Sequence, residues 1–243
     1  MSLEKLRMFS HNNKNRNAVG FTLLELLIVI GIMVILGTVL IIVLNPAETL
    51  KRSRDNQRFS DLQTLKTALG LYVTEVSSPD LDSSVLSTFC LTNISGSTTG
   101  SAQIFYSRPL TTDPNCAVAL TPGADAETGS DFSGVDFCRY ATATNYTKID
   151  ASGWVPVDLT QIRGGSPISN LPIDPTNTMT STDGSAPATT DLVYRYGCQN
   201  AVGANSTKPQ YIFEIDAVLE SATYSGKKST DGGDNDTFYE MGN

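Results

Sequence analysis

The sequence predicts an α+β protein in which a long N-terminal helix precedes a β-sheet head with long loops. Residues 26–44 contain no charged side chain over 19 positions, about the length that an α-helix needs to cross a bilayer. Apolar residues then recur three or four positions apart up to Val76, which predicts an amphipathic helix. The remainder alternates short apolar runs with stretches rich in Ser, Thr, Gly, Asp and Asn, as strands joined by loops do.

The apolar segment predicts a transmembrane helix, although charge alone does not orient it. Residues 1–20 carry four basic side chains against one acidic side chain, and a basic flank normally stays cytoplasmic. The opposite flank is also basic, through Lys51, Arg52, Arg54 and Arg58. A cleaved secretory signal fits poorly, because the chain continues as Asn45-Pro46-Ala47-Glu48 rather than as a small-residue cleavage site. A plain membrane anchor fits the length but leaves Glu25 unexplained.

The long helix is expected to run from about Phe21 to about Val76 with a kink or short break at Pro46. Proline removes a backbone donor and clashes with the preceding helical turn. The second half should bury one face, formed by Phe59, Leu62, Leu65, Leu69, Tyr72 and Val76. Charged residues are expected mainly off that face, namely Lys51, Arg52, Arg54, Asp55, Arg58, Asp61 and Lys66.

Four short runs after this helix are typical of strands. They are residues 104–106, 138–141, 192–196 and 211–216, and in the last of them Tyr211, Phe213 and Ile215 share one side. The single tryptophan, Trp154, is expected in the core rather than at a ligand site.

Composition argues against an enzyme and against nucleic acid as a direct partner. Residues 21–243 carry 13 basic and 24 acidic side chains, whereas phosphate binding needs a basic face. The single histidine, His11, lies before the apolar segment. Without it the chain offers no Ser-His-Asp or Cys-His pair and no histidine for a metal site. A hydrolase attached to the membrane helix is therefore disfavoured.

Glu25 raises a question of its own, because an unpaired carboxylate in hydrocarbon is costly. The stretch Gly20-Phe21-Thr22-Leu23-Leu24-Glu25, preceded by a basic segment and followed by the apolar run, resembles the leader junction of type IV pilins and type II secretion pseudopilins. The resemblance implies a pilin-like fold: a long helix packed on an antiparallel sheet. It also implies cleavage after Gly20 by a prepilin peptidase and N-methylation of Phe21.

The resemblance gives Glu25 a role in assembly. Glu25 would be the fifth residue of the mature chain, where it can approach the N-terminal ammonium of a neighbouring subunit. A charge in a low-dielectric bundle is stable only when it is paired, and such a pair can set the register between subunits. Alternatively, Glu25 reaches the membrane surface before assembly. The implied partners are further copies of this chain, prepilin peptidase, an inner-membrane assembly platform, minor pilins and membrane lipid.

Three segments follow from this interpretation. Residues 1–20 form a leader, residues 21–76 the helix with 21–44 in the membrane or filament core, and residues 77–243 an exported head. The stretches Gly153-Trp154-Val155-Pro156-Val157-Asp158 and Leu171-Pro172-Ile173-Asp174-Pro175 resemble the heads of bacterial pilin-like proteins. Asp174 is expected to cap a turn between two prolines.

Four cysteines, Cys90, Cys116, Cys138 and Cys198, are candidates for two disulfides in an exported head. None forms a CxxC pair, so a zinc ribbon is disfavoured. Cys90–Cys116 and Cys138–Cys198 are the favoured pairs because they close loops of modest length. Four buried thiols are the alternative.

The acidic C-terminal segment contains Asp231, Asp234 and Asp236 among glycines, a composition that can surround a hard cation. It resembles the C-terminal loop of major pseudopilins, which binds calcium, so Ca²⁺ is the one cofactor expected. A flexible tail or an Asx-rich turn is the alternative.

The expected function is therefore a structural subunit of a type IV pilus or a type II secretion pseudopilus. The expected location is a single-pass membrane protein with an exported head, and after assembly a periplasmic or cell-surface filament. The alternative is a pilin-anchored minor subunit that acts as an adhesin or as a DNA- or ligand-binding module. A basic or aromatic patch on the head would favour that alternative, and the sequence shows no basic cluster there beyond Lys227-Lys228.

Overall fold

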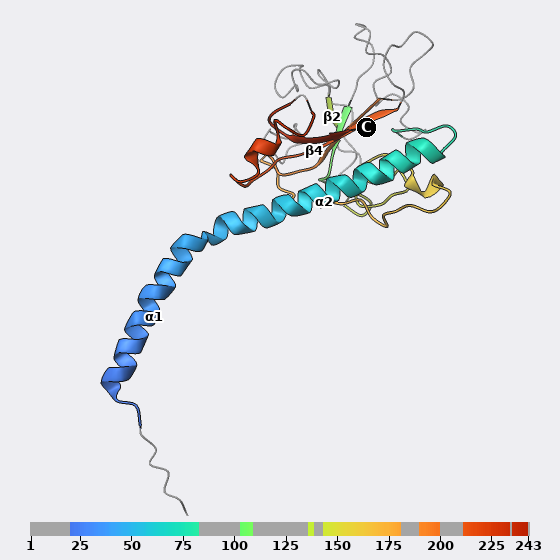
Figure 1. Ribbon diagram of the computed structural model, residues 1–243. Coiled ribbons are helices and arrows are strands. Elements are labelled where there is room, and N and C mark those ends of the chain that lie inside the picture. Colours follow the sequence, from blue (N-terminus) through green and yellow to red (C-terminus); the bar gives the residue numbers. More distant parts are fainter. Residues whose placement is uncertain are drawn as a thin grey trace, which may run out of the picture. The chain divides into compact units, whose positions relative to one another are not determined.

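The computed structural model describes residues 20–82, 103–108, 136–138, 143–180, 190–199, 211–233 and 235–242. The elements are α1 (Leu23–Leu44), α2 (Pro46–Glu75), β1 (Gln103–Tyr106), β2 (Asp136–Cys138), η1 (Leu159–Gln161), β3 (Arg195–Gln199), β4 (Ile212–Ala217), η2 (Ser225–Lys227) and β5 (Tyr239–Gly242) (Figure 1). The chain divides into two compact units, Met1–Pro46 and Ala47–Asn243. Nearly all of α2 therefore belongs to the unit that contains the sheet.

The helix α1 has a defined start and end. Thr22 caps its N-terminus, and the Thr22 hydroxyl accepts a hydrogen bond from the Glu25 amide at 3.2 Å. Asn45 ends it in the left-handed conformation, with φ 37° and ψ 74°. Pro46 then opens α2, a first-turn position at which its missing N–H costs nothing. The predicted interruption at Pro46 is confirmed, and it consists of the single residue Asn45.

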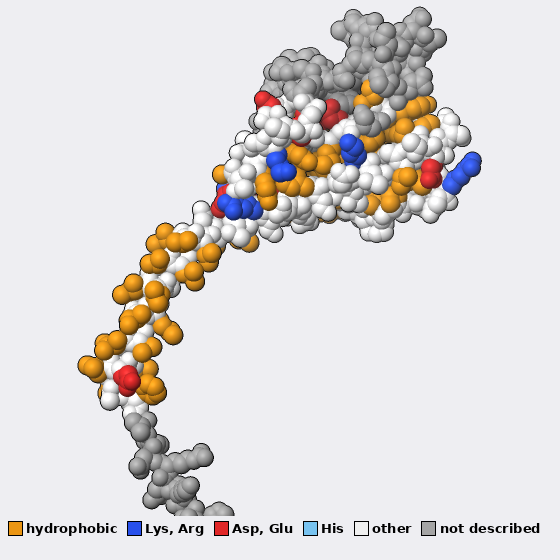
Figure 2. All heavy atoms as spheres, viewed as in Figure 1, with side chains coloured by type: hydrophobic (Ala, Val, Ile, Leu, Met, Phe, Trp, Pro, Cys, Tyr) orange, Lys and Arg blue, Asp and Glu red, His pale blue; other side chains and the backbone are white. Residues whose placement is uncertain are grey.

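The surface of α1 is apolar. Its 22 residues include one charged side chain, Glu25, and none of the 22 is buried. Figure 2 shows hydrophobic side chains along the visible face of this helix. Within the described residues, one helical stretch, Leu23–Glu75, contains a window long and apolar enough to cross a membrane, by length and composition. That window lies near the N-terminus, and a signal sequence at this place would have a similar length and composition.

The sheet has the strand order β2-β1-β3-β4-β5. Strands β1, β3, β4 and β5 pair antiparallel, as expected for the head, whereas β2 pairs parallel to β1. The predicted strands at 104–106 and 211–216 match β1 and β4 closely. The strand predicted at 192–196 is shifted, because β3 spans Arg195–Gln199. Of the run predicted at 138–141, Cys138 lies at the end of β2 and the rest lies outside the described residues. Strand β5 was not among the predicted strands.

The main core lies between one face of α2 and one face of the sheet. Leu62, Leu65, Leu69 and Tyr72 are buried as predicted, together with Ala68, whereas Phe59 is half-buried. The sheet contributes alternate residues, because successive side chains of a strand point to opposite faces. The buried residues from the strands are Phe105, Tyr196, Cys198, Phe213, Ile215 and Ala217. Trp154 is 1% exposed in the same cluster, which confirms its predicted core position.

Candidate functional site

Gly20, Phe21 and Glu25 lie where the chain enters α1. Gly20 and Phe21 precede the first helical residue, and all three residues are exposed. Glu25 lies in the first turn, where a carboxylate interacts favourably with the positive end of the helix dipole. The cleavage and assembly positions predicted from the sequence thus lie within six residues at an uncovered helix start. The first 19 residues of the expected leader lie outside the described residues.

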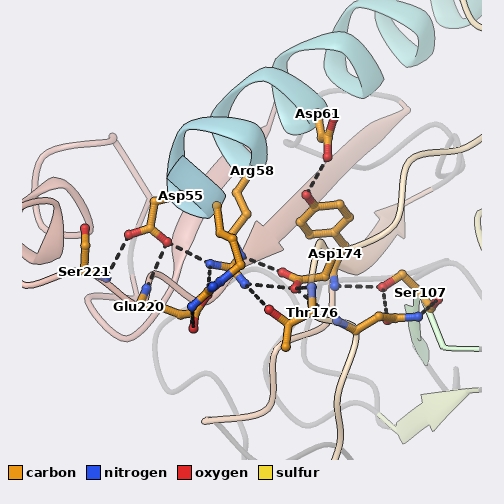
Figure 3. Close-up of polar contacts among 11 residues, drawn as sticks. Asp55, Arg58, Asp61, Ser107, Asp174, Thr176, Glu220 and Ser221 are labelled. Carbon is orange, nitrogen blue, oxygen red and sulfur yellow. Dashed lines mark hydrogen bonds and ion pairs between the residues drawn. The ribbon is translucent and has the colours of Figure 1, made fainter. Parts of the chain in front are cut away.

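A second group of polar residues joins α2 to two loops of the head. We call Arg54, Asp55, Arg58, Asp174 and Glu220 the α2 clamp. The guanidinium of Arg58 lies at its centre and is 0% exposed (Figure 3). Its Nε and Nη2 donate to the two carboxylate oxygens of Asp174 at 2.6 and 2.9 Å, a bidentate geometry. Its Nη1 donates to Asp55 and to Glu220, both at 2.8 Å.

The carboxylates of the α2 clamp also bind backbone amides of the loops. Asp55 accepts hydrogen bonds from the amides of Glu220 and Ser221 at 3.0 and 2.8 Å. Asp174 accepts from the amides of Thr176 and Asn177 at 2.8 and 3.2 Å, so the turn-capping role predicted for it is confirmed. Asp55 and Asp174 thus each bind both the guanidinium of Arg58 and the backbone of a loop.

Arg54 completes the clamp at its outer edge. Its Nε and Nη2 donate to the Glu220 carboxylate at 2.7 and 2.8 Å. The hydrogen bond from Arg54 holds the pKa of Glu220 below its usual value, although burial works in the opposite direction. Burial works to lower the pKa of Arg58, but the hydrogen bonds to Asp174, Glu220 and Asp55 raise it overall. Both shifts favour the charged forms, of Glu220 and of Arg58.

The clamp corrects the expectation that the charged residues of α2 lie off its buried face. Asp55 and Arg58 are fully buried, because their charges are compensated by each other and by Asp174 and Glu220. The spacing contained a signal for this, since 55, 58, 62 and 65 continue the three- and four-residue period of the apolar face. The basic segment 51–58 is correspondingly less available as a surface cluster, with Arg54 and Arg58 both paired.

One turn beyond the clamp, Asp61 links α2 to Tyr194, the residue that precedes β3. The Tyr194 hydroxyl donates to the Asp61 carboxylate at 2.8 Å (Figure 3). Burial raises the pKa of Asp61, and the hydrogen bond from Tyr194 partly opposes that shift. Burial likewise raises the pKa of the Tyr194 hydroxyl above its usual value. The proton therefore stays on Tyr194, which keeps this donor available.

Trp154 connects the segments 153–158 and 171–175 of the head. Its indole Nε1 donates to the carbonyl of Pro172 at 2.8 Å, and its amide donates to the carbonyl of Tyr146 at 2.9 Å. Gly153 leaves no room for a side chain, because an added Cβ would meet the Lys148 carbonyl. These contacts place Asp174, two residues after Pro172, against Arg58.

The residues predicted to bind calcium have different surroundings. Asp231 accepts hydrogen bonds from the amides of Gly233 and Glu240 at 3.1 and 2.9 Å, Asp236 is exposed, and Asp234 lies outside the described residues. Among the described residues, the carboxylates whose geometry could hold a metal are those of Glu214, Asp216 and Glu240, with ligand atoms within 4.8 Å of one another. That group lies on the sheet face opposite the main core. It was not among the predicted sites, because β5 itself was not predicted. Calcium binding stays a prediction.

Of the four cysteines, only the Cys198 side chain lies in the described part of the chain. It is buried and disulfide-bonded, to a cysteine outside the described side chains. The favoured pairing with Cys138 does not fit the sheet, because strand β1 lies between β2 and β3. Phe105 of β1 is paired with Cys138 on one side and with Tyr196, two residues before Cys198, on the other. Two strand spacings separate those backbones by about 9–10 Å. A disulfide requires Cα atoms within about 7 Å. Cys90 and Cys116 lie outside the described residues.

No protein-family model matches the chain, and the comparisons with curated proteins and with solved structures found no match.

Proposed function

We propose that the chain is a structural filament subunit of the type IV pilin and type II secretion pseudopilin kind. In this proposal α1 holds the chain in the membrane until assembly, when it enters the core of a helical filament. The chain is cleaved after Gly20 and methylated at the new N-terminus, Phe21. The single observation that carries the proposal is α1 itself: an exposed, predominantly apolar helix whose only charged residue, Glu25, lies in its first turn.

The carboxylate of Glu25 is costly in any apolar environment. Exposed apolar residues over 22 positions need a bilayer or other copies of the helix around them. Inside either environment Glu25 has to be paired or neutralised. Cleavage after Gly20 would create an ammonium group four residues away in sequence, and a neighbouring subunit could offer the same ammonium to Glu25.

The head contributes stability and a surface in this proposal. The α2 clamp ties the helix to the loops at 174–177 and 218–221, so that an assembly force applied to α2 also moves the head. The proposal assigns a role in assembly to this chain.

The first experiment is the intact mass and N-terminal sequence of the protein from native membranes. The proposal expects a chain that begins at Phe21 and is heavier by one methyl group. A Gly20→Trp variant, which blocks the cleavage position, should remain at full length while staying in the membrane. A wild-type chain that begins at Met1, or that is cut after residue 44, would overturn the proposal in favour of a plain anchor or a signal peptide.

A further inference from the structure

The outer edge of β5 is a place where another strand could join the sheet. Strand β5 is the last strand of the sheet, and no other described strand pairs with its outer side. Such an edge carries backbone N–H and C=O groups that can pair with a strand from another chain. In an antiparallel pair, alternate residues direct these groups away from the partner strand. The amide of Glu240 is directed outward in this way, because it donates to the Asp231 side chain rather than to β4.

The segment before β5 covers this edge. We call Asp231, Gly232, Gly233 and Asn235 the strap. One carboxylate oxygen of Asp231 accepts the Glu240 amide at 2.9 Å, and the other accepts the Gly233 amide at 3.1 Å. In the reverse direction, the amide of Asn235 donates to the Glu240 carboxylate at 3.1 Å. Glu240 of β5 thus binds the strap twice. Its backbone amide donates to Asp231, and its side-chain carboxylate accepts from the amide of Asn235.

The two glycines fit the strap to the strand. Gly232 adopts φ +97°, a conformation that other residues rarely adopt. A Cβ added at Gly233 would collide with the carboxylate of Glu240, which is itself only 3% exposed. The run Asp231-Gly232-Gly233 therefore allows the close approach that a strap over this strand requires.

We propose that the strap is a guard that keeps β5 from pairing with β5 of a second copy of the chain. The occupant that it excludes is a second copy, because identical exposed edges can pair antiparallel about a two-fold axis. The guard stands independently of the filament proposal, since it concerns the sheet edge and not α1. It assigns a folding and solubility role to an acidic, glycine-rich segment for which calcium binding is the other expectation.

A cavity of about 490 Å³ beside the strap is consistent with this arrangement. Its lining includes Lys66 of α2, Asp231 of the strap and all four residues of β5. The space therefore adjoins the strap and the full length of the strand.

The test uses the full-length chain in detergent micelles, with Asp231→Ala and Gly233→Ala as the strap variants. Asp236→Ala is the matched control, because Asp236 is exposed, lies in the same segment and removes the same charge. Hydrogen–deuterium exchange of residues 239–242 at low protein concentration should be about fivefold faster in the strap variants, since one hydrogen bond is lost. At high concentration that protection should return as dimers form, and light scattering should show the dimers.

The outcomes separate a guard from a local turn. Faster exchange without added dimer at any concentration would overturn the proposal, as would unchanged exchange in both strap variants. A dimer increase of equal size in Asp236→Ala would assign the effect to charge rather than to the strap. If Asp231→Ala does not fold, Asp231→Asn carries the comparison, because it keeps one of the two acceptors and should give an intermediate effect.

Discussion

Arg58 shows how a charged residue can occupy a core position. Its side chain lies in phase with Leu62 and Leu65 on α2, yet it is as deeply buried as they are. The cost of removing the guanidinium from water is offset by three carboxylates in contact with it. The carboxylates in turn need the positive charge of Arg58, because a buried charge without a partner is costly. Arg58 is therefore expected to contribute more to the stability of the fold than an exposed charged residue does.

Replacing Arg58 by methionine should destabilise the protein by about 3–5 kcal/mol, because Asp55 and Asp174 would stay buried without their cation. Chemical denaturation followed by tryptophan fluorescence would measure this, since Trp154 lies in the same core. Arg163→Met is the control: Arg163 is exposed, and its replacement should change stability by less than about 0.5 kcal/mol. Equal effects from the two variants would show that the clamp adds nothing.

Glu220 should make stability depend on acid. Its pKa in the folded protein lies below the usual value of 4.5, chiefly because of the hydrogen bond from Arg54. The folded state therefore binds fewer protons than the unfolded chain, and stability from Glu220 is present above pH 4.5 and is lost as pH falls below it. Glu220→Gln should lower stability at neutral pH and flatten its decline in acid. The control, Glu75→Gln at an exposed position of α2, should leave the slope unchanged.

At the scale of elements, what the sequence predicts well depends on length and periodicity. The apolar α1 and the amphipathic α2 follow from patterns repeated over 22 and 30 residues. The break at Asn45 follows from the chemistry of Pro46. Short strands carry too few side chains for a comparable signal, and β3 was accordingly misplaced, because it spans Arg195–Gln199 rather than 192–196. Strand β5 was not predicted because its surroundings in the sequence are polar, which is typical of a solvated tail. Asp231 instead accepts a hydrogen bond from the amide of Glu240 in this strand.

The C-terminal element also carries the calcium prediction. If the loop holds the ion, Asp231→Asn should abolish calcium binding measured by calorimetry on the full-length chain, and Glu214→Gln should leave it nearly unchanged. If the group on the sheet face holds it, the effects of these two variants should be reversed. Removal of calcium with a chelator should lower the melting temperature of the wild type in either case. Absence of both binding heat and a melting shift would contradict the prediction.

At the scale of the whole molecule, assembly should depend on one carboxylate in α1. Glu25→Val should leave a processed, membrane-held protein, because the apolar span and the residues at the cleavage position are unchanged. Its filament yield should fall about tenfold or more, since even ~1.4 kcal/mol lost per contact reduces association tenfold. Thr38→Val is the control, as it alters a polar group of the same helix without changing its charge. A normal yield from Glu25→Val in sheared-filament preparations would contradict the register role.

The candidate site divides in the same way between what sequence could predict and what it could not. Gly20, Phe21 and Glu25 are read directly from a contiguous stretch, and the structure adds that they are exposed at a helix start. The α2 clamp joins residues more than 160 positions apart, from Arg54 to Glu220, and no local pattern brings them together. The spacing of Asp55 and Arg58 hinted at burial, but their partners follow only from the packing of the loops.

The contribution of α2 to the core has a practical consequence for anyone who wishes to express the head in soluble form. A fragment that starts at Ser77, just after the helix, would lack Leu62, Leu65, Leu69 and Tyr72 and would open the sheet to solvent. It would also leave Asp174 without its arginine. Limited proteolysis should instead yield a resistant product that begins near Ala47, ahead of both arginines of the clamp, and such a product is the form suited to secretion, crystallisation or display.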